Sequence, residues 1–188
     1  DLFMRQLFGL DAISLRALQK HYYQQYGTTL RGLMIEHNID AAHYLDFVHD
    51  IDRSSLPHNH SLAQAIAALP GRRLIFTNGD ADYAGRVLDR LGLGQAFELI
   101  HDIHACQYVP KPDPSGYDAL CRAHDVDPTR AAFFEDMARN LKPAKAIGMT
   151  TLWSDNGSEQ SPDADRSFID YTTHDLAHWL ATLSTETA

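Results

Sequence analysis

An apolar run that stops abruptly on two adjacent carboxylates constrains this chain more than any other stretch. Ala132, Phe133 and Phe134 are followed directly by Glu135 and Asp136. A continuous apolar run is typical of a strand covered on both faces, as the parallel strands of α/β proteins are. Ligands of such sheets bind beyond the carboxyl ends of the strands, so we expect the two acids at the rim of a cleft. The simpler alternative is a strand end whose acids only cap the next helix.

Neighbouring carboxylates repel each other unless a proton or a cation lies between them. Oxygen ligands of this kind suit Mg²⁺, so Glu135 and Asp136 are candidate metal ligands. Asn140 follows Asp136 by four residues and comes round one helical turn toward the same rim. The pattern therefore predicts a Mg²⁺ site at the end of this strand, with Asn140 orienting the loop.

The apolar pattern of the whole chain predicts an α/β fold with a helical N-terminal part. From residue 1 to about 56 the spacing is helical throughout, with Asp11, Thr28 or Thr29, and Asp40 as helix starts. From residue 60 onward helices alternate with short apolar strands, which is typical of a parallel sheet with helices on both faces. We therefore expect a helical cap at residues 1–57 and a Rossmann-like core at residues 58–188. The expected strands lie near residues 74–76, 99–103, 132–134, 150–153 and 168–171.

Charge and cysteine content narrow the class of partner. The formal net charge of −9 argues against a nucleic-acid polymer or an anionic membrane, although a local cation can still hold a small anionic substrate. Cys106 and Cys121, the only cysteines, lack a metal-binding spacing, and we interpret them as reduced thiols of a cytoplasmic protein, with one disulfide as the alternative. No apolar run approaches membrane-spanning length.

Polar groups follow two further strand ends. Thr77, Asn78 and Gly79 come directly after one expected strand, and Lys111 lies between two prolines after another. A hydroxyl and backbone amides at a strand-to-helix turn can bind phosphate oxygens, and a lysine supplies a point positive charge. Taken singly, these are also common turn chemistry and a solvated loop lysine. Together with a Mg²⁺ site they predict a phosphoryl-transfer site that lacks only a nucleophile.

These motifs, in this order, resemble the haloacid dehalogenase-like phosphatase superfamily over about residues 1 to 155. The matching stretches are Phe76-Thr77-Asn78-Gly79, Lys111-Pro112, and Phe134-Glu135-Asp136 with Asn140. Within the superfamily, the chain looks like the pyrimidine 5'-nucleotidase branch at residues 26–33, 48–52 and 134–141. The resemblance implies a helical cap over a Rossmann-like core, Mg²⁺, and hydrolysis of nucleoside monophosphates such as UMP and CMP through an aspartyl-phosphate.

The resemblance also implies a role for each matching residue. Thr77, Asn78, Gly79 and Lys111 would grip the phosphate, and Lys111 would offset the repulsion between an attacking carboxylate and the phosphate dianion. Asp136 would bind the metal directly, and Glu135 directly or through water. In the cap, Arg31 is our candidate for contacting the substrate, with a surface arginine as the alternative.

The superfamily's first motif, a strand ending in Asp-x-Asp, is missing from the expected place. Asp50-Ile51-Asp52, Asp125-Val126-Asp127 and Asp163-Ala164-Asp165 have the spacing, but none follows an expected strand, and we reject all three as nucleophiles. The family's layout puts the missing strand before residue 1, in the centre of the sheet between the strands ending at Thr77 and Glu135. Without it, backbone groups would be left unpaired, so we expect an N-terminally incomplete copy that is not stable alone.

Three functions stay open from the sequence. The first is a pyrimidine 5'-nucleotidase in the full-length form. The second is a phosphatase of the same fold acting on another small phosphomonoester, such as phosphoglycolate or a sugar phosphate. The third is a phosphate-binding module that has lost catalysis, because the Asp-x-Asp motif is absent. Zinc binding by the eleven histidines is not favoured, because no three of them have a suitable spacing.

Overall fold

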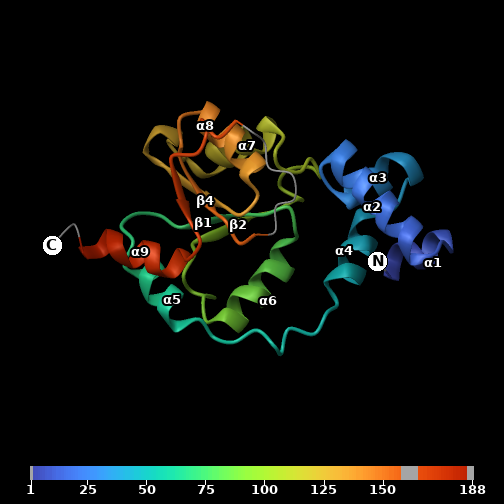
Figure 1. Cartoon of the computed structure of the whole chain (residues 1–188), viewed down its shortest axis with the longest axis horizontal. Helices are drawn as coiled ribbons and strands as arrows, with labels where there is room; N and C mark the ends of the chain where they lie inside the picture. The colour runs from blue at the N-terminus through green and yellow to red at the C-terminus, as the bar shows by residue number, and fades with distance from the viewer. Residues whose placement is uncertain (1, 158–164, 186–188) are drawn as a thin grey trace.

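The computed structural model describes residues 2–157 and 165–185, and its first four elements are helices, as predicted (Figure 1). They are α1 (Leu2–Phe8), α2 (Ala12–Tyr26), α3 (Thr29–His37) and α4 (Ala41–His49). The Asp11 carboxylate accepts hydrogen bonds from two backbone amides at the start of α2, and Asn38 ends α3 in the left-handed conformation. We call residues 2–49 the N-terminal helical region, which lies at one end of the molecule (Figure 1).

After α4 the chain alternates between helices and short strands, which confirms the α/β prediction. The helices are α5 (His60–Ala67), α6 (Ala81–Leu91), α7 (Pro114–His124), α8 (Leu141–Ala146) and α9 (Leu176–Thr185), with 3₁₀ turns η1 (Pro128–Arg130) and η2 (Ala138–Asn140). The strands are β1 (Leu74–Phe76), β2 (Leu99–His101), β3 (Ala132–Glu135), β4 (Thr150–Ser154) and β5 (Tyr171–Thr173). Within the described residues, no helix has the length and apolar character that crossing a membrane requires.

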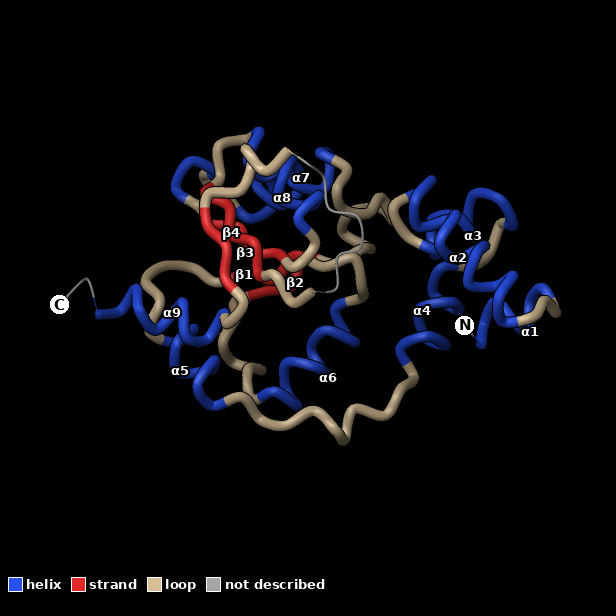
Figure 2. Tube along the Cα trace, viewed as in Figure 1, coloured by secondary structure: helices blue, strands red, loops and turns tan. Residues whose placement is uncertain are grey.

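All strand pairs between described residues are parallel, but they form two sheets. Figure 2 shows these strands in red, among the helices. β1 pairs with β2, with Leu74 opposite Leu99, and β4 lies between β3 and β5. β1 and β3 are not hydrogen-bonded to each other. The carboxyl ends of both strands nevertheless reach a common lysine, described below, so the two sheets meet at the candidate site.

Helices cover both faces of the strands, as the apolar run predicts. Phe133 and Phe134 are successive residues of β3, so their side chains point to opposite faces. Phe133 packs against Tyr117 of α7 and Ala144 of α8. Phe134 packs into a cluster from α5, α6 and α9 that includes Leu180, which is 2% exposed. The run before the acids is therefore buried from two sides, which fixes the strand end and the direction of the residues after it.

The N-terminal helical region has its own core and also packs on the loop after β2. Gly32 of α3 lies against the ring of Tyr22 of α2, where a β-carbon would come within 2.5 Å of Tyr22 Cγ. Ile103, which is 2% exposed, packs against Leu30 and Leu45 of the helical region. The expected strand at residues 99–103 therefore ends at His101, because Ile103 turns toward the helices instead.

The last strand was predicted at the wrong residues. Phe168 lies in a turn and packs against Ala138 and Leu141, and the strand begins at Tyr171, which pairs with Leu152 of β4. Phe168 is thus a buried apolar residue in a turn, and an apolar pattern does not distinguish such a residue from one in a strand. The predicted surface loop of residues 154–167 includes residues 158–164, which lie outside the described residues.

Candidate active site

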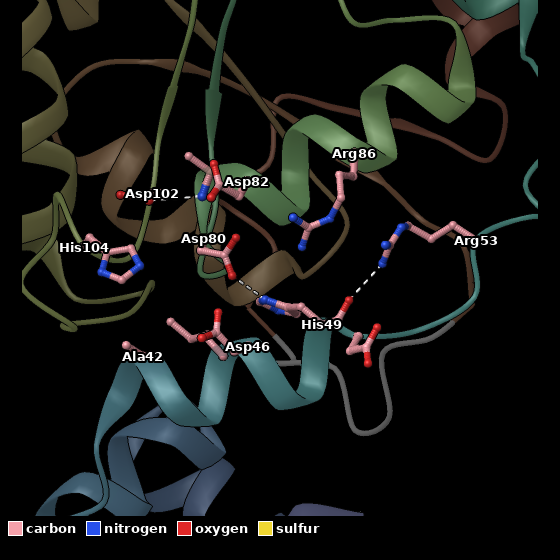
Figure 3. A pocket seen from close by; sticks show the side chains of 12 residues that line it. Ala42, Asp46, His49, Arg53, Asp80, Asp82, Arg86, Asp102 and His104 are labelled. Atoms are coloured by element: carbon pink, nitrogen blue, oxygen red, sulfur yellow. Dashed lines mark hydrogen bonds and ion pairs between the residues drawn. The ribbon is translucent and has the colours of Figure 1, made fainter.

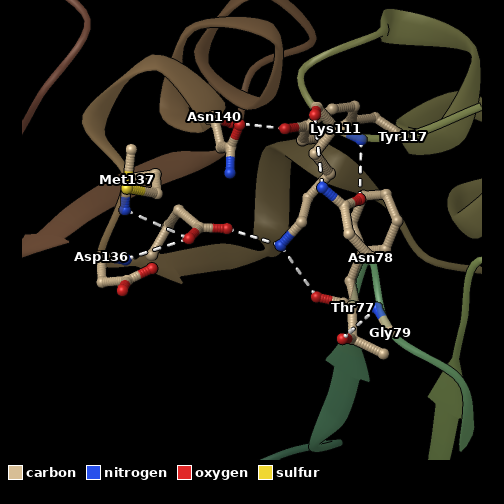
Figure 4. Close-up of polar contacts among 10 residues, drawn as sticks. Thr77, Asn78, Gly79, Lys111, Tyr117, Asp136, Met137 and Asn140 are labelled. Atoms are coloured by element: carbon tan, nitrogen blue, oxygen red, sulfur yellow. Dashed lines mark hydrogen bonds and ion pairs between the residues drawn. The ribbon is translucent and has the colours of Figure 1, made fainter. Parts of the chain in front are cut away.

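Lys111 is the centre of the candidate site. Its ammonium Nζ donates to the backbone oxygen of Phe76 at 2.9 Å and to Oε2 of Glu135 at 2.5 Å (Figure 4). The same Nζ lies 5.0 Å from the ring centre of Phe76 and 5.5 Å from that of Phe133, within reach of cation–π attraction. Lys111 is only 8% exposed. The predicted loop lysine is therefore a buried cation that joins the ends of β1 and β3.

Glu135, the partner of Lys111, accepts hydrogen bonds through both of its carboxylate oxygens. Its Oε1 accepts from the backbone amides of Asp136 at 3.1 Å and Met137 at 3.2 Å, while Oε2 faces Lys111. Burial raises the pKa of the Glu135 carboxyl, and the ammonium of Lys111 acts in the opposite direction. An acid with a raised pKa beside a buried lysine is the kind of paired titratable group that is common at functional sites.

The turn after β1 contacts the lysine loop through Asn78. The Asn78 amide group donates to the backbone oxygen of Lys111 at 3.3 Å, and Asn78 Oδ1 accepts from the Lys111 amide at 2.8 Å. Thr77 Oγ1 accepts from the Gly79 amide at 2.9 Å. Asn78 therefore positions the backbone of Lys111, while Thr77 shapes its own turn.

The start of α6 offers fewer free amides than the sequence argument assumed. The Ala81 amide donates to the Asp102 carboxylate at 3.0 Å, and the Tyr83 amide donates to Asp80 at 2.6 Å. Both amides already have anionic partners, and the Gly79 amide is bonded to Thr77. Lys111 is therefore the main positive group of the candidate phosphate site.

Asp136 and Asn140 flank the buried pair. Asp136 is exposed and its carboxylate points away from Lys111 (Figure 4), with Oδ2 accepting from Asn156 at 3.3 Å. Asn140 is 5% exposed, and its backbone oxygen accepts from the Tyr117 hydroxyl at 2.5 Å. Its side-chain Oδ1 is buried without a hydrogen-bond partner. A buried acceptor without a donor is costly, so Asn140 marks a place where a further group would be favourable.

These side chains do not make a complete Mg²⁺ site by themselves. Their oxygens are of the type that Mg²⁺ prefers, but Glu135 is engaged by Lys111. Among residues 2–157 and 165–185, no group of three or more acidic, histidine or cysteine side chains is arranged to hold a metal ion. Metal binding by Asp136 and Glu135 stays a prediction.

Two Asp-x-Asp stretches, at residues 50–52 and 125–127, lie at helix ends. Asp50 follows the last residue of α4, Asp125 ends α7 in the left-handed conformation, and Asp127 caps η1. None of these carboxylates follows a strand. The stretch at residues 163–165 extends outside the described residues. Residues 50–52 and 125–127 are therefore excluded as strand-end nucleophiles.

Arg31, the predicted substrate contact, bonds to the segment that precedes Lys111. Its Nη1 donates to the backbone oxygen of Tyr108 at 3.2 Å. This bond ties α3 to the segment that leads to Lys111. The structure thus brings together Lys111, Asn78 and Glu135, with Thr77 and Asp136 beside them, and it gives Arg31 an anchoring contact.

Sequence reasoning missed Arg139. Its guanidinium lies 4.1 Å over the ring of Tyr23 and donates to the backbone oxygen of Gly27 at 3.3 Å. Gly27 has φ +84°, and a β-carbon there would come within 3.0 Å of Pro110. One turn of the helical region therefore touches both the acid loop and the lysine loop. No local pattern signals this contact, because the partners are more than one hundred residues apart.

Sequence reasoning also missed the contact between His49 and Asp80. Nδ1 of His49, the last residue of α4, contacts the carboxylate of Asp80, which caps α6 (Figure 3). Asp80 has the residue type of a helix cap, but nothing in the sequence points to its histidine partner. This contact is a second link between the helical region and the strand-end loops.

The geometry defines a parallel-stranded α/β protein with a buried lysine–acid pair at the carboxyl ends of its strands. Residues 5–148 match a family model described as haloacid dehalogenase-like hydrolase. The chain belongs to the haloacid dehalogenase-like hydrolase family. The general resemblance seen in the sequence is thereby confirmed.

Individual relatives agree with this family. The chain is 33% identical over 102 residues to validoxylamine A 7'-phosphate phosphatase of Streptomyces hygroscopicus subsp. limoneus, covering 52% of this chain and 46% of that protein. It is 26% identical over 167 residues to phosphate metabolism protein 8 of Saccharomyces cerevisiae, covering 78% and 51%. The chain therefore spans about half the length of these curated relatives. A crystal structure of a dehalogenase shares the fold, with a TM-score of 0.63 and 19% identity over 96% of this chain and 89% of that one.

Proposed function

We propose that this chain is part of a phosphatase that hydrolyses a small phosphomonoester, with a sugar phosphate or a related polyhydroxylated compound as the preferred class. The observation that carries the proposal is the buried Lys111 ammonium at the meeting point of two strand ends. The relative that is 33% identical is named as a phosphatase of a 7'-phosphate, which supports this class over a nucleotide.

Lys111 supplies the charge that a phosphate dianion requires. Its ammonium is fixed by the Phe76 oxygen and Glu135, so little rearrangement is needed when an anion arrives. An incoming phosphate competes with Glu135 for this ammonium.

The aspartate nucleophile and Mg²⁺ enter the proposal as expectations that the family implies. Asp136 is the exposed carboxylate at this edge that could contribute to a metal site. We expect phosphomonoester hydrolysis by a longer form of the protein to be lost on chelation of divalent metal with EDTA. Full activity in EDTA would contradict the metal part of the proposal.

Binding of inorganic phosphate tests the charged site directly, on this chain or, where the missing strand is needed for folding, on a longer form. We expect Lys111→Met to weaken the affinity, measured by calorimetry, by about tenfold or more, because a charged hydrogen bond contributes about 1.5–3 kcal/mol. A Lys111→Met, Glu135→Gln double variant removes the unpaired acid and should show the same loss. The control is Lys145→Met, because Lys145 pairs with Asp170 on the surface. Equal phosphate affinity in all four proteins would overturn the proposal.

A pyrimidine 5'-nucleotidase is the second candidate. The observation in its favour is the resemblance of residues 26–33, 48–52 and 134–141 to that branch. Turnover of UMP, CMP, sugar phosphates and phosphoglycolate by a longer form distinguishes the candidates. Higher kcat/KM for UMP and CMP than for any sugar phosphate would replace our first choice with the nucleotidase.

A further inference from the structure

A polar cavity of about 640 Å³ lies between α4 and the start of α6, outside the lysine site (Figure 3). Its walls carry both carboxylates and basic side chains. It is also bounded by the two parts of the molecule that meet at His49 and Asp80. A cavity of this size falls in the range that holds small-molecule ligands.

His49 and Asp80 form a fixed pair in this wall. Nδ1 of His49 contacts one carboxylate oxygen of Asp80, whose other oxygen accepts from the Tyr83 amide at 2.6 Å. The His49 ring stacks on the Tyr83 ring, with centres 4.0 Å apart and planes 12° from parallel. The two side chains are 14% and 15% exposed. Both groups are therefore held before any ligand arrives.

The pair leaves one nitrogen of His49 available. Burial alone would raise the pKa of Asp80, but hydrogen bonds from Tyr83 and His49 hold it below its ordinary value, so the carboxylate is ionised. An ionised acid at Nδ1 favours the tautomer with the proton on that nitrogen. Nε2 of His49 has no hydrogen-bond partner among the described residues. It can form a hydrogen bond with a hydroxyl group, which both donates and accepts.

This nitrogen-bearing ring lies beside the turn that follows β1. A β-carbon built on Gly79 would be 3.4 Å from Thr77 Oγ1 and 3.8 Å from Cε1 of His49. The Thr77 hydroxyl and the His49 ring therefore both lie within 4 Å of one position beside the Gly79 backbone. A ligand whose phosphate lies at the turn has the histidine within reach of its next few atoms.

The remaining charged groups of the cavity favour hydroxyl groups over a second anion. The side chains of Asp46, Asp50 and Asp82 make no hydrogen bond or ion pair to a described residue. The Arg86 side chain makes none either, although its charge helps to lower the pKa of Asp80. Figure 3 shows Asp46, Asp82 and Arg86 around the His49–Asp80 contact. Carboxylates accept from hydroxyl groups and repel phosphate. Arg86, and Arg53, whose Nη1 donates to the His49 backbone oxygen, can donate to a hydroxyl or ring oxygen.

We propose that the cavity beside His49 and Asp80 binds the polyhydroxylated part of a phosphomonoester, with Nε2 of His49 hydrogen-bonded to a substrate hydroxyl. This inference rests on the proposed phosphatase function and extends it by assigning the residues that recognise the sugar-like part. It makes His49 a residue that determines specificity, and Asp80 the residue that positions it.

The test compares two probes, inorganic phosphate and ribose 5-phosphate, by calorimetry on the full chain. We expect the wild type to bind ribose 5-phosphate more tightly. His49→Phe keeps a ring to stack on Tyr83 but removes both nitrogens. It should weaken ribose 5-phosphate by about tenfold, the loss expected for a hydrogen bond to a positioned group, and change inorganic phosphate by less than about twofold.

Two further variants sharpen the comparison. Asp80→Asn keeps a good helix cap but loses the charge that orients His49, so it should weaken only ribose 5-phosphate, by a smaller factor. His21→Phe, at an exposed position of α2, is the control and should change neither affinity. If His49→Phe alters both probes equally, or neither, the inference is overturned while phosphate binding stands. If the wild type binds neither probe, the proposed function fails and the inference with it.

Discussion

Lys111 and Glu135 carry opposite charges in a place that water hardly reaches, with side chains only 9% and 8% exposed. Removing one member of such a pair leaves the other buried without a partner. We expect Glu135→Gln to lower the free energy of unfolding by about 3–5 kcal/mol, measured by urea denaturation. The matched control is Glu98→Gln at the exposed pair with Arg72, which should cost less than about 1 kcal/mol. Equal losses in the two variants would contradict the buried character of the Lys111 pair.

The burial of His101 predicts that the free energy of unfolding depends on pH. The residue is 3% exposed, with Nδ1 3.1 Å from Nε2 of His124. Burial, and then the neighbouring His124, lower the pKa of His101 below its ordinary value of 6.5. The unfolded chain therefore takes up a proton more readily than the folded one as the pH falls below 6.5, and stability falls with it.

The comparison that checks this effect is His101→Gln, which cannot titrate. Between pH 7 and pH 5 we expect the wild type to lose on the order of 1 kcal/mol more than the variant, because one pKa unit corresponds to about 1.4 kcal/mol. Parallel stability curves for the two proteins would show that His101 does not contribute.

Two glycines inside helices differ in the space around them, so alanine at each should change stability in opposite directions. A β-carbon on Gly32 of α3 would lie 2.5 Å from the Tyr22 ring of α2, whereas one on Gly85 of α6 would meet nothing within 4 Å. Gly32→Ala should therefore force α2 and α3 apart and cost about 1–3 kcal/mol. Gly85→Ala should stabilise the protein by up to about 1 kcal/mol, because alanine favours a helix. Thermal unfolding of both variants checks the signs, and a stabilising Gly32→Ala would show that the helices do not pack this closely.

Helix boundaries followed from the sequence where a local cap determines them. Asp80 and Gly92 bracket α6, and Asp113 with Pro114 opens α7; these residue types are typical of such helix ends. Strand positions followed less well, since Phe168 is buried from a turn by contacts with α8 that no local pattern contains. The same division applies to the site. Lys111 and Glu135 could be predicted from strand ends, but Arg139 and His49 act through partners distant in sequence.

The separation of β1 from β3 predicts that successive backbone amides of β1 exchange with solvent at different rates. Alternate residues of a strand direct their backbone groups to opposite sides, and the Thr77 amide bonds to His101 on the β2 side. Phe76 therefore faces β3, and its oxygen is taken by Lys111 instead of a strand. We expect the Phe76 and Leu74 amides to exchange with solvent at least tenfold faster than the Ile75 amide, as for edge-strand groups.

Hydrogen exchange followed by NMR checks this expectation, and the same experiment on a longer form tests the predicted central strand. If that strand pairs with β1, the Phe76 and Leu74 amides should become as protected as Ile75. Strong protection of Phe76 in the present chain would contradict the separation of the two sheets.

The turn around Gly27 contacts the two loops that carry Lys111 and Glu135, although it carries no charged group of the site itself. It contacts Pro110 on one side and Arg139 on the other, so a shift of α2 or α3 moves both loops together. Changes that retune the site can therefore accumulate in the helices while Lys111 and Glu135 stay as they are. The phosphatase proposed above could therefore change its substrate preference by varying its helical surface, because the charged groups and the helices that contact their loops are carried by separate stretches of sequence.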